Sequence, residues 1–287
     1  MHITNSRLLK AIYTGLLAGM PSFIFNPINR VNLLAPLKVE QYSTYLNFKL
    51  DDKQVKYLNN YISEYNYNNP IDIDNNNKLD NLQLIPLKMG VFQQPAYYIS
   101  VNIYNCTSPI FMSNIPIIRC EINTYVKNMR GERGTMIIDY LSNAISMDPV
   151  NIFKQPDNII FDKQNKILKN TQSKNTQSKN KLESISIKCY SKREKIDLHV
   201  DFDIDNYKIL KIGNKLIDYT DNIYYKNGIM DKIYYDTTLT RAKIYQPKNS
   251  RDFRFIYRDL SFNKIDSIFY FDNPLNFVGS MWDNIYN

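Results

Sequence analysis

Cysteine and histidine are scarce in this sequence, which has three cysteines and two histidines among 287 residues. Cys106, Cys120 and Cys189 are far apart, and no pair has the short spacing of zinc ligands. An odd number of distant cysteines argues against a disulfide framework and favours a reducing, cytoplasmic compartment. His2 lies at the start of the chain, so His199 has no second histidine to help it. We therefore expect no metal site and no cofactor.

Glycine is also scarce, with eight residues. The glycine-rich phosphate loop and the dinucleotide fingerprint are absent, as are the motifs of serine hydrolases and zinc peptidases. One charged turn, residues 130–134, contains two glycines. A phosphate loop leads into a helix, whereas the residues after this turn alternate like a strand. The turn is therefore predicted to be the bend of a β-hairpin.

No apolar run is long enough to span a bilayer, so we expect no membrane association. The strongest candidate, residues 6–21, has apolar positions spaced along one helical face, with Ser6 as its cap and Pro21 beyond its end. We interpret it as an amphipathic helix packed on the domain. The alternative is a targeting segment within residues 1–20, although no clear small-residue cleavage site follows.

Charge of one sign is not concentrated anywhere. The net charge is +8, but acidic residues are interleaved with the basic ones, whereas nucleic-acid binders gather basic residues on one face. The densest basic run, residues 188–195, is interpreted as a solvated loop, with a phosphate-binding patch as the alternative. Nucleic acid is not an expected partner. Abundant Asn, Ile, Lys and Tyr residues are typical of AT-rich genomes, and a virus-encoded source, such as a giant virus, fits that bias, as do some protists and parasites.

Most of the chain alternates apolar and polar residues, as half-buried strands do. Residues 42–50 and 96–105 are examples, and Asn227-Gly228 marks a hairpin. After residue 50 the period changes to that of a helix capped by Asp51 or Asp52. Many strands, few helices and a repeat near ten residues predict a mostly β (α+β) protein, an antiparallel barrel or sandwich.

One domain is predicted over residues 1–287, with two segments that stand apart. Residues 1–40 are expected to form the N-terminal helix and an extended arm. Residues 170–180 repeat Thr-Gln-Ser-Lys-Asn in tandem and contain no apolar side chain, which predicts a solvated, low-complexity loop insertion. An RNA-binding tail is the alternative for this repeat.

Two predicted strands carry candidate chemistry. Between residues 118 and 126, apolar side chains take one face, and Arg119 and Glu121 lie on the other. If that polar face points into a confined interior, the pKa of Glu121 is expected to rise; if it meets solvent, Glu121 has no role. On residues 196–203, an exposed polar face around His199 is favoured over a cation site, because ligands on one flat strand cannot close a shell.

Three segments carry a resemblance. They are "NFKLDDKQVKYLNNYI" (47–62), "IIRCEINTYVKNMRGERGTMIIDYLSNAISMD" (117–148) and "DPVNIFKQP" (148–156). Their order resembles the acetoacetate decarboxylase family, which has a cone-like antiparallel β-barrel with a few peripheral helices. Lys49 lies where the family has an arginine, and Glu121 falls on its active-site glutamate. The third segment lies where the family has its catalytic lysine, and Lys154 is the nearest lysine.

The resemblance implies a carboxy-lyase that decarboxylates a small keto acid. Lys154 would form a Schiff base with the ketone, and Glu121 would orient the substrate or move a proton. Lys49 and Arg119 would be the substrate-binding residues, with Lys49 attracting the substrate carboxylate.

Two other interpretations stay open. Asp148-Pro149-Val150 replaces the family's Gly-Arg-Glu, and the neutral Gln155 follows Lys154. These departures favour a catalytically degenerate barrel that binds a small apolar ligand. The positive charge and the solvated repeat are compatible with a structural or virion-associated interaction protein. A homo-oligomer is compatible with each interpretation.

Overall fold

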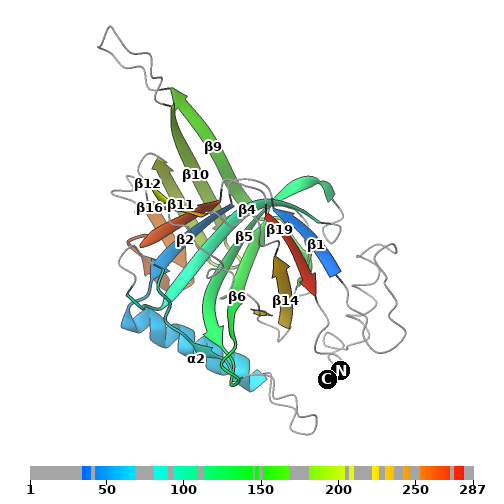
Figure 1. The fold of residues 1–287 in the computed structure, drawn as a ribbon, viewed down its shortest axis with the longest axis vertical. Helices are drawn as coiled ribbons and strands as arrows, with labels where there is room; N and C mark the ends of the chain where they lie inside the picture. Colours follow the sequence, from blue (N-terminus) through cyan, green and yellow to red (C-terminus); the bar gives the residue numbers. More distant parts are fainter. Residues whose placement is uncertain are drawn as a thin grey trace.

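Strands make up most of the described part of this protein in its computed structural model, and one long helix lies beside them (Figure 1). The structure describes residues 34–39, 43–68, 81–89, 94–108, 113–144, 146–148, 151–167, 181–203, 207–209, 222–225, 230–235, 242–245, 253–271 and 275–280.

The strands form two large sheets and one small one. In spatial order, the 12-stranded sheet contains β12 (Tyr207–Ile209), β15 (Ala242–Tyr245), β18 (Ser267–Phe271), β2 (Ser43–Lys49), β4 (Tyr98–Ser108), β1 (Leu34–Val39), β19 (Leu275–Ser280), β14 (Met230–Tyr235), β13 (Asn222–Tyr225), β6 (Arg133–Ser142), β5 (Ser113–Lys127) and β3 (Gln83–Leu84). The 5-stranded sheet contains β17 (Leu260–Phe262), β16 (Phe253–Tyr257), β11 (Ile196–Asp203), β10 (Lys181–Ser191) and β9 (Asn158–Ile167). The remaining pair is β7 (Ser146–Asp148) and β8 (Asn151–Lys154).

Nearly all described strand pairs are antiparallel, and β13 with β6 is the parallel exception. Besides its neighbours β2 and β1, β4 also pairs with β5, so the large sheet bends back on itself at β4. The predicted antiparallel β architecture with few helices is confirmed. The described strands do not establish a closed barrel, and the decarboxylase-like cone stays a prediction.

The helix α2 (Asp52–Asn68) begins at the predicted cap. Asp51 Oδ1 accepts a hydrogen bond from the Gln54 backbone N–H at 2.8 Å, and Gln54 Oε1 accepts one from the Asp51 N–H at 2.9 Å. This reciprocal arrangement is a capping box, and it satisfies two N–H groups that the first turn leaves without partners. Leu58 and Ile62 turn the apolar side of the helix into the core.

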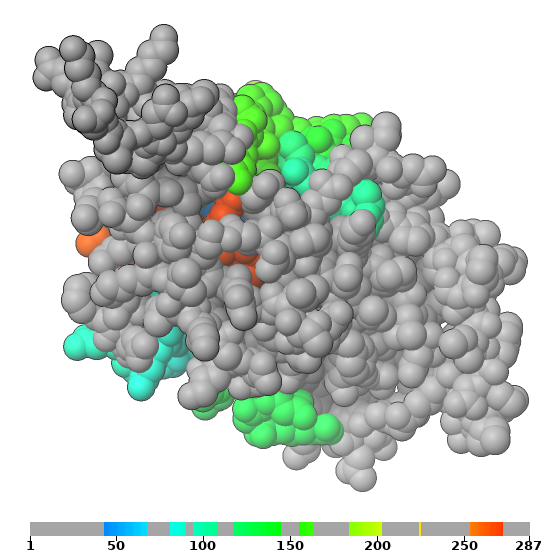
Figure 2. All heavy atoms as spheres, turned by 45° about the horizontal axis from the view of Figure 1, so that its top comes forward, coloured from blue at the N-terminus to red at the C-terminus, as the bar shows by residue number. Residues whose placement is uncertain are grey.

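The charged turn at residues 130–134 joins β5 to β6, which confirms the hairpin prediction. Asn128 organises the turn, because its side-chain oxygen accepts hydrogen bonds from the backbone N–H groups of Arg130 and Glu132. Gly131 has a φ of 80°, a left-handed conformation that costs glycine little. The green atoms at the lower edge of Figure 2 belong to residues 117–144, the segment that contains this turn.

Other predictions fall partly outside the described residues. The N-terminal helix lies outside them, and within the predicted arm residues 34–39 form β1. The repeat at residues 170–180 is also outside, between the paired strands β9 and β10. Asn227-Gly228 lies between β13 and β14, which pair antiparallel as a hairpin requires.

The main hydrophobic cluster joins the two large sheets and α2. Phe48 of β2 is at its centre, with its ring centroid 4.7 Å from that of Phe255 and 5.3 Å from that of Phe262. Aromatic pairs at such distances contribute about 1 kcal/mol beyond the area that they bury. The 5-stranded sheet therefore packs on the side of the large sheet that carries Phe48.

Replacing Asp51 with alanine is expected to lower the free energy of unfolding by about 1 kcal/mol, because the first turn of α2 loses its cap. Urea denaturation followed by circular dichroism measures the change. Glu64→Ala is the matched control, since Glu64 is exposed and lies in the interior of the helix. Equal losses in both variants would contradict the capping role.

Candidate functional site

Strands β4, β5 and β6 carry polar side chains on the side away from the 5-stranded sheet. Glu121 pairs in register with Asn102 of β4 and Tyr140 of β6, and Arg119 pairs with Tyr104 of β4. Paired residues of adjacent strands lie on the same side of a sheet. We call this side the polar face, made of Ser100, Asn102, Tyr104, Arg119, Glu121, Asn123, Tyr125, Thr135 and Tyr140.

The polar face is buried. Glu121 is 9% exposed and Arg119 5%, and the other members are also buried. On the opposite side of β5, Cys120 and Ile122 belong to the main hydrophobic cluster. A second cluster, which includes Tyr98, lies with Tyr104 and Tyr125 on the polar side. Strand β5 is therefore covered on both sides, and the alternative in which Glu121 faces solvent is wrong.

Glu121 has two strong hydrogen-bond donors. Its Oε1 accepts from the Tyr104 hydroxyl at 2.6 Å and from Arg119 Nε at 2.8 Å. The Arg119 guanidinium also lies over the ring of Tyr140, with Cζ 4.5 Å from the ring centroid. A buried charge needs an opposite charge and hydrogen bonds, and this arrangement gives Glu121 both.

Burial raises the pKa of the Tyr104 hydroxyl well above its usual value, and the negative charge of Glu121 raises it further. Burial also raises the pKa of Tyr125. Both phenols therefore stay protonated and act as hydrogen-bond donors at neutral pH.

A row of hydrogen bonds crosses the large sheet beside this cluster. The Tyr125 hydroxyl donates to Ser100 Oγ at 2.8 Å, and the Ser100 hydroxyl donates to Asn47 Oδ1 at 2.6 Å. Asn47 Nδ2 donates to Ser267 Oγ at 3.2 Å, and the Ser267 hydroxyl donates to the Met89 carbonyl at 3.3 Å. These bonds fix the side chains of β5, β4, β2 and β18 relative to one another.

The structure brings two of the four predicted site residues together. Arg119 and Glu121 form an ion pair. Lys49 is exposed at the end of β2. It lies four residues beyond Tyr45, the β2 residue level with Glu121 across β4, which corresponds to about 13 Å along the strand. Lys154 ends β8, and its side chain lies outside the described residues.

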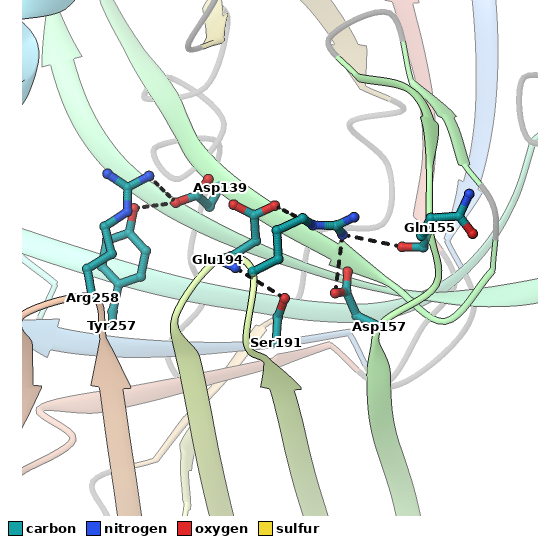
Figure 3. A network of polar contacts seen from close by, with 8 residues as sticks. Asp139, Gln155, Asp157, Ser191, Glu194, Tyr257 and Arg258 are labelled. Atoms are coloured by element: carbon teal, nitrogen blue, oxygen red, sulfur yellow. Dashed lines mark hydrogen bonds and ion pairs between the residues drawn. The ribbon is translucent and has the colours of Figure 1, made fainter.

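A second polar network lies between the two large sheets (Figure 3). Asp139 Oδ2 accepts from the Tyr257 hydroxyl at 2.5 Å and from Arg258 Nη2 at 2.7 Å. Burial first, and then the charge of Asp139, raise the pKa of Tyr257. The Arg258 guanidinium also lies 5.7 Å from the ring centroid of Tyr61 on α2. This network joins β6, β16 and α2, and we assign it a structural role.

The basic run of residues 188–195 contributes Arg193 to a further group of polar contacts. Arg193 is ion-paired with Asp157 at 3.4 Å and with Glu194 at 3.1 Å. Arg193 also donates to the Gln155 carbonyl at 3.4 Å, and the Glu194 backbone N–H donates to Ser191 Oγ. In Figure 3 the dashed contacts around Gln155, Asp157, Ser191 and Glu194 form a group separate from the contacts of Asp139 with Tyr257 and Arg258. Neighbouring carboxylates therefore partly neutralise the densest basic run.

On β11, His199 contacts Asp201 at 3.1 Å, and both side chains are substantially exposed. The alternate residues, including Leu198 and Val200, are buried, so the predicted division of this strand into two faces is confirmed. Within the described residues, no group of three histidine, cysteine or acidic side chains could hold a metal ion. No described helix has the length and hydropathy needed to cross a membrane.

Sequence reasoning missed Tyr104 and Tyr140 as partners of the ion pair. Their signal is present in the alternation of their strands, because Ser100, Asn102 and Tyr104 occupy every second position between apolar residues of β4. Two strands with this pattern each have one apolar side and one side that mixes polar and aromatic residues. Such a mixed side is typical of a polar interior no less than of an exposed surface.

No family model matches the chain, and no curated protein matches it with significant similarity.

Raising the pH above 10 is expected to unfold the protein cooperatively. The folded state holds the pKa of Tyr104, Tyr125 and Tyr257 above the ordinary 10.0, whereas the unfolded chain does not. Their contribution to stability is therefore complete below pH 10 and is lost as the pH rises toward the folded-state values.

Phenolate absorbance and circular dichroism, recorded together from pH 8 to 13, measure this. The last part of the absorbance rise should coincide with the loss of the β-sheet signal in circular dichroism. Tyr125→Phe should reduce this last part of the rise by the absorbance of one phenol. A complete absorbance rise before any circular dichroism change would contradict the burial of these rings.

Proposed function

We propose that this protein binds a small molecule against the polar face, with the Glu121–Arg119 ion pair as the polar anchor of the site. The observation that supports this most strongly is the burial of a hydrogen-bonded carboxylate and guanidinium on the side of β5 opposite the main hydrophobic cluster. A barrel of the acetoacetate decarboxylase type is the fold that we propose around it.

Stability alone does not account for such a pair. Replacing a buried ion pair by apolar residues of similar volume is often neutral or stabilising, because both charges lose their hydration on burial. A few convergent polar groups among aromatic and aliphatic side chains are typical of small-molecule sites. Tyr104 and Tyr140 supply aromatic surface beside Glu121 and Arg119, which matches that description.

Decarboxylation of a small keto acid through a lysine Schiff base is the second candidate. It is favoured by the burial of Glu121, which falls on the active-site glutamate of the family that the sequence resembles. In this mechanism the Lys154 amine would condense with the ketone and release water, and the resulting iminium would accept the electron pair left by the departing carboxylate as carbon dioxide.

The described side chains favour binding over catalysis. No lysine among them is buried, and a reactive amine requires a desolvated or positively charged environment to lower its pKa. Lys49 is exposed and distant from Glu121 along β2. Of the two lysines that the sequence predicts in the site, Lys154 is then the one left to supply the amine.

A thermal-shift screen of small molecules, keto acids included, is expected to find ligands whose affinity depends on Glu121. Glu121→Gln should weaken them about tenfold or more, which corresponds to at least one hydrogen bond to a charged group. Isothermal titration calorimetry measures the affinities.

Glu194→Gln is the matched control, because Glu194 is also paired with an arginine but lies in the turn between β10 and β11. It should leave the affinities unchanged. Ligands that bind both variants as tightly as the natural protein, or no ligand at all, would contradict the proposed site.

Treatment with acetoacetate and borohydride separates the two candidates. Borohydride reduces a lysine imine to a stable secondary amine, which peptide mass spectrometry locates. Binding without catalysis predicts no adduct at any lysine. A reduced adduct at Lys154 that is lost in Lys154→Arg would establish the lyase instead.

A further inference from the structure

Two buried side-chain oxygens of the polar face make no hydrogen bond. They are Oδ1 of Asn123 and Oγ1 of Thr135, which find no partner anywhere in the structure as described. Asn123 is 3% exposed and Thr135 is 6% exposed. Other buried polar groups of this face, such as Ser100 and Tyr125, are hydrogen-bonded. The two unpaired oxygens are therefore exceptions among the buried polar groups of this face.

The strand register places the two residues close together. Thr135 of β6 pairs with Tyr125 of β5, and Asn123 is two residues from Tyr125 on the same side of β5. Asn123 and Thr135 are thus diagonal neighbours, at a backbone separation of about 7–8 Å. Glu121 is the next residue along the polar face of β5. One small molecule that lies across β5 and β6 could contact both oxygens and the ion pair.

Leaving a buried hydrogen-bonding group without a partner is unfavourable, because it gives up its bonds to water on folding. Both positions could hold apolar residues of the same shape, and valine in place of Thr135 would remove the problem. Retention of two such groups next to a buried ion pair suggests that a bound molecule supplies the missing partners.

The chemistry of the two groups restricts that molecule. An amide oxygen only accepts hydrogen bonds, whereas a threonine hydroxyl both accepts and donates. Glu121 and Arg119 neutralise each other at 2.8 Å, so the site has no unbalanced charge to attract an ionic group. An uncharged molecule with O–H or N–H donors fits these requirements.

We propose that Asn123 and Thr135 form the hydrogen-bonding contacts of the ligand site, and that the ligand is a small uncharged molecule bearing hydroxyl or amide donors. This inference rests on the proposed binding function and specifies the ligand class and two contact residues for it.

The test uses three sets of probes on the full chain: neutral polyols and monosaccharides, primary amides, and carboxylates of matched size. Binding is expected in one of the two neutral sets, and which set responds identifies hydroxyl or amide donors. Thr135→Val and Asn123→Leu should each weaken the neutral ligand about tenfold. Without ligand, Thr135→Val should keep or raise the melting temperature, because it removes an unpaired buried group.

Thr124→Val is the matched control. Thr124 is buried on the opposite side of β5, and its hydroxyl donates to the Tyr98 carbonyl at 3.0 Å. This substitution should lower the melting temperature, because it breaks a hydrogen bond, and leave ligand affinity unchanged.

Three outcomes would overturn the inference. If only carboxylates bind, the ligand class is wrong. If a neutral ligand loses affinity in Glu121→Gln but binds Thr135→Val and Asn123→Leu normally, the contacts are wrong while the proposed function stands. If no probe or screened compound binds, both proposals fail.

Discussion

A carboxylate taken out of water must be paired, and at Glu121 this requirement involves three strands. Tyr104 of β4 and Arg119 of β5 bind its oxygen, and Tyr140 of β6 covers the guanidinium. The partners come from different strands, so the cluster forms only when β4, β5 and β6 are in their native register. A one-residue slip of β5 would move Glu121 to the side of Ile122 and into the main hydrophobic cluster.

The rest of the fold shields this cluster from solvent. The main hydrophobic cluster, with Phe48 between the sheets, fixes one side of β5, and the aromatic residues of the second cluster lie on the other. The Asp139–Tyr257–Arg258 network then ties β6 to β16. The second of these two polar networks holds the sheets together, and the first is the one at which we propose that a ligand binds.

Local patterns predicted the elements well. The capping residue of α2, the hairpin between β5 and β6 and the two sides of β11 all follow from residues adjacent in sequence. Alternation also assigned Arg119 and Glu121 to one side of their strand. It could not decide whether that side is buried, because the second-cluster residues on the same side, such as Tyr98 and Phe269, are distant in sequence from Arg119 and Glu121.

The side of β6 on which Asp139 lies could not be predicted from the sequence, for a related reason. The register of β5 with β6 shifts by one residue between Ile122 and Asn123, so β6 contains an extra residue there. This bulge places Asp139 on the side that faces β16, whereas uninterrupted alternation from Met136 would place it on the polar face. The Ile137-Ile138 doublet is the only local sign of it. The side chain of Lys154 lies outside the described residues, so its role stays a prediction.

A double-mutant cycle on Glu121 and Tyr104 tests the central claim most directly. The free energies of unfolding of Glu121→Leu, Tyr104→Phe and the double variant are measured by urea denaturation. A buried hydrogen bond to a carboxylate predicts a coupling energy of about 1.5–3 kcal/mol between the two substitutions. Effects that add to within about 0.5 kcal/mol would contradict the account, because they would mean that the two groups do not interact in the folded protein.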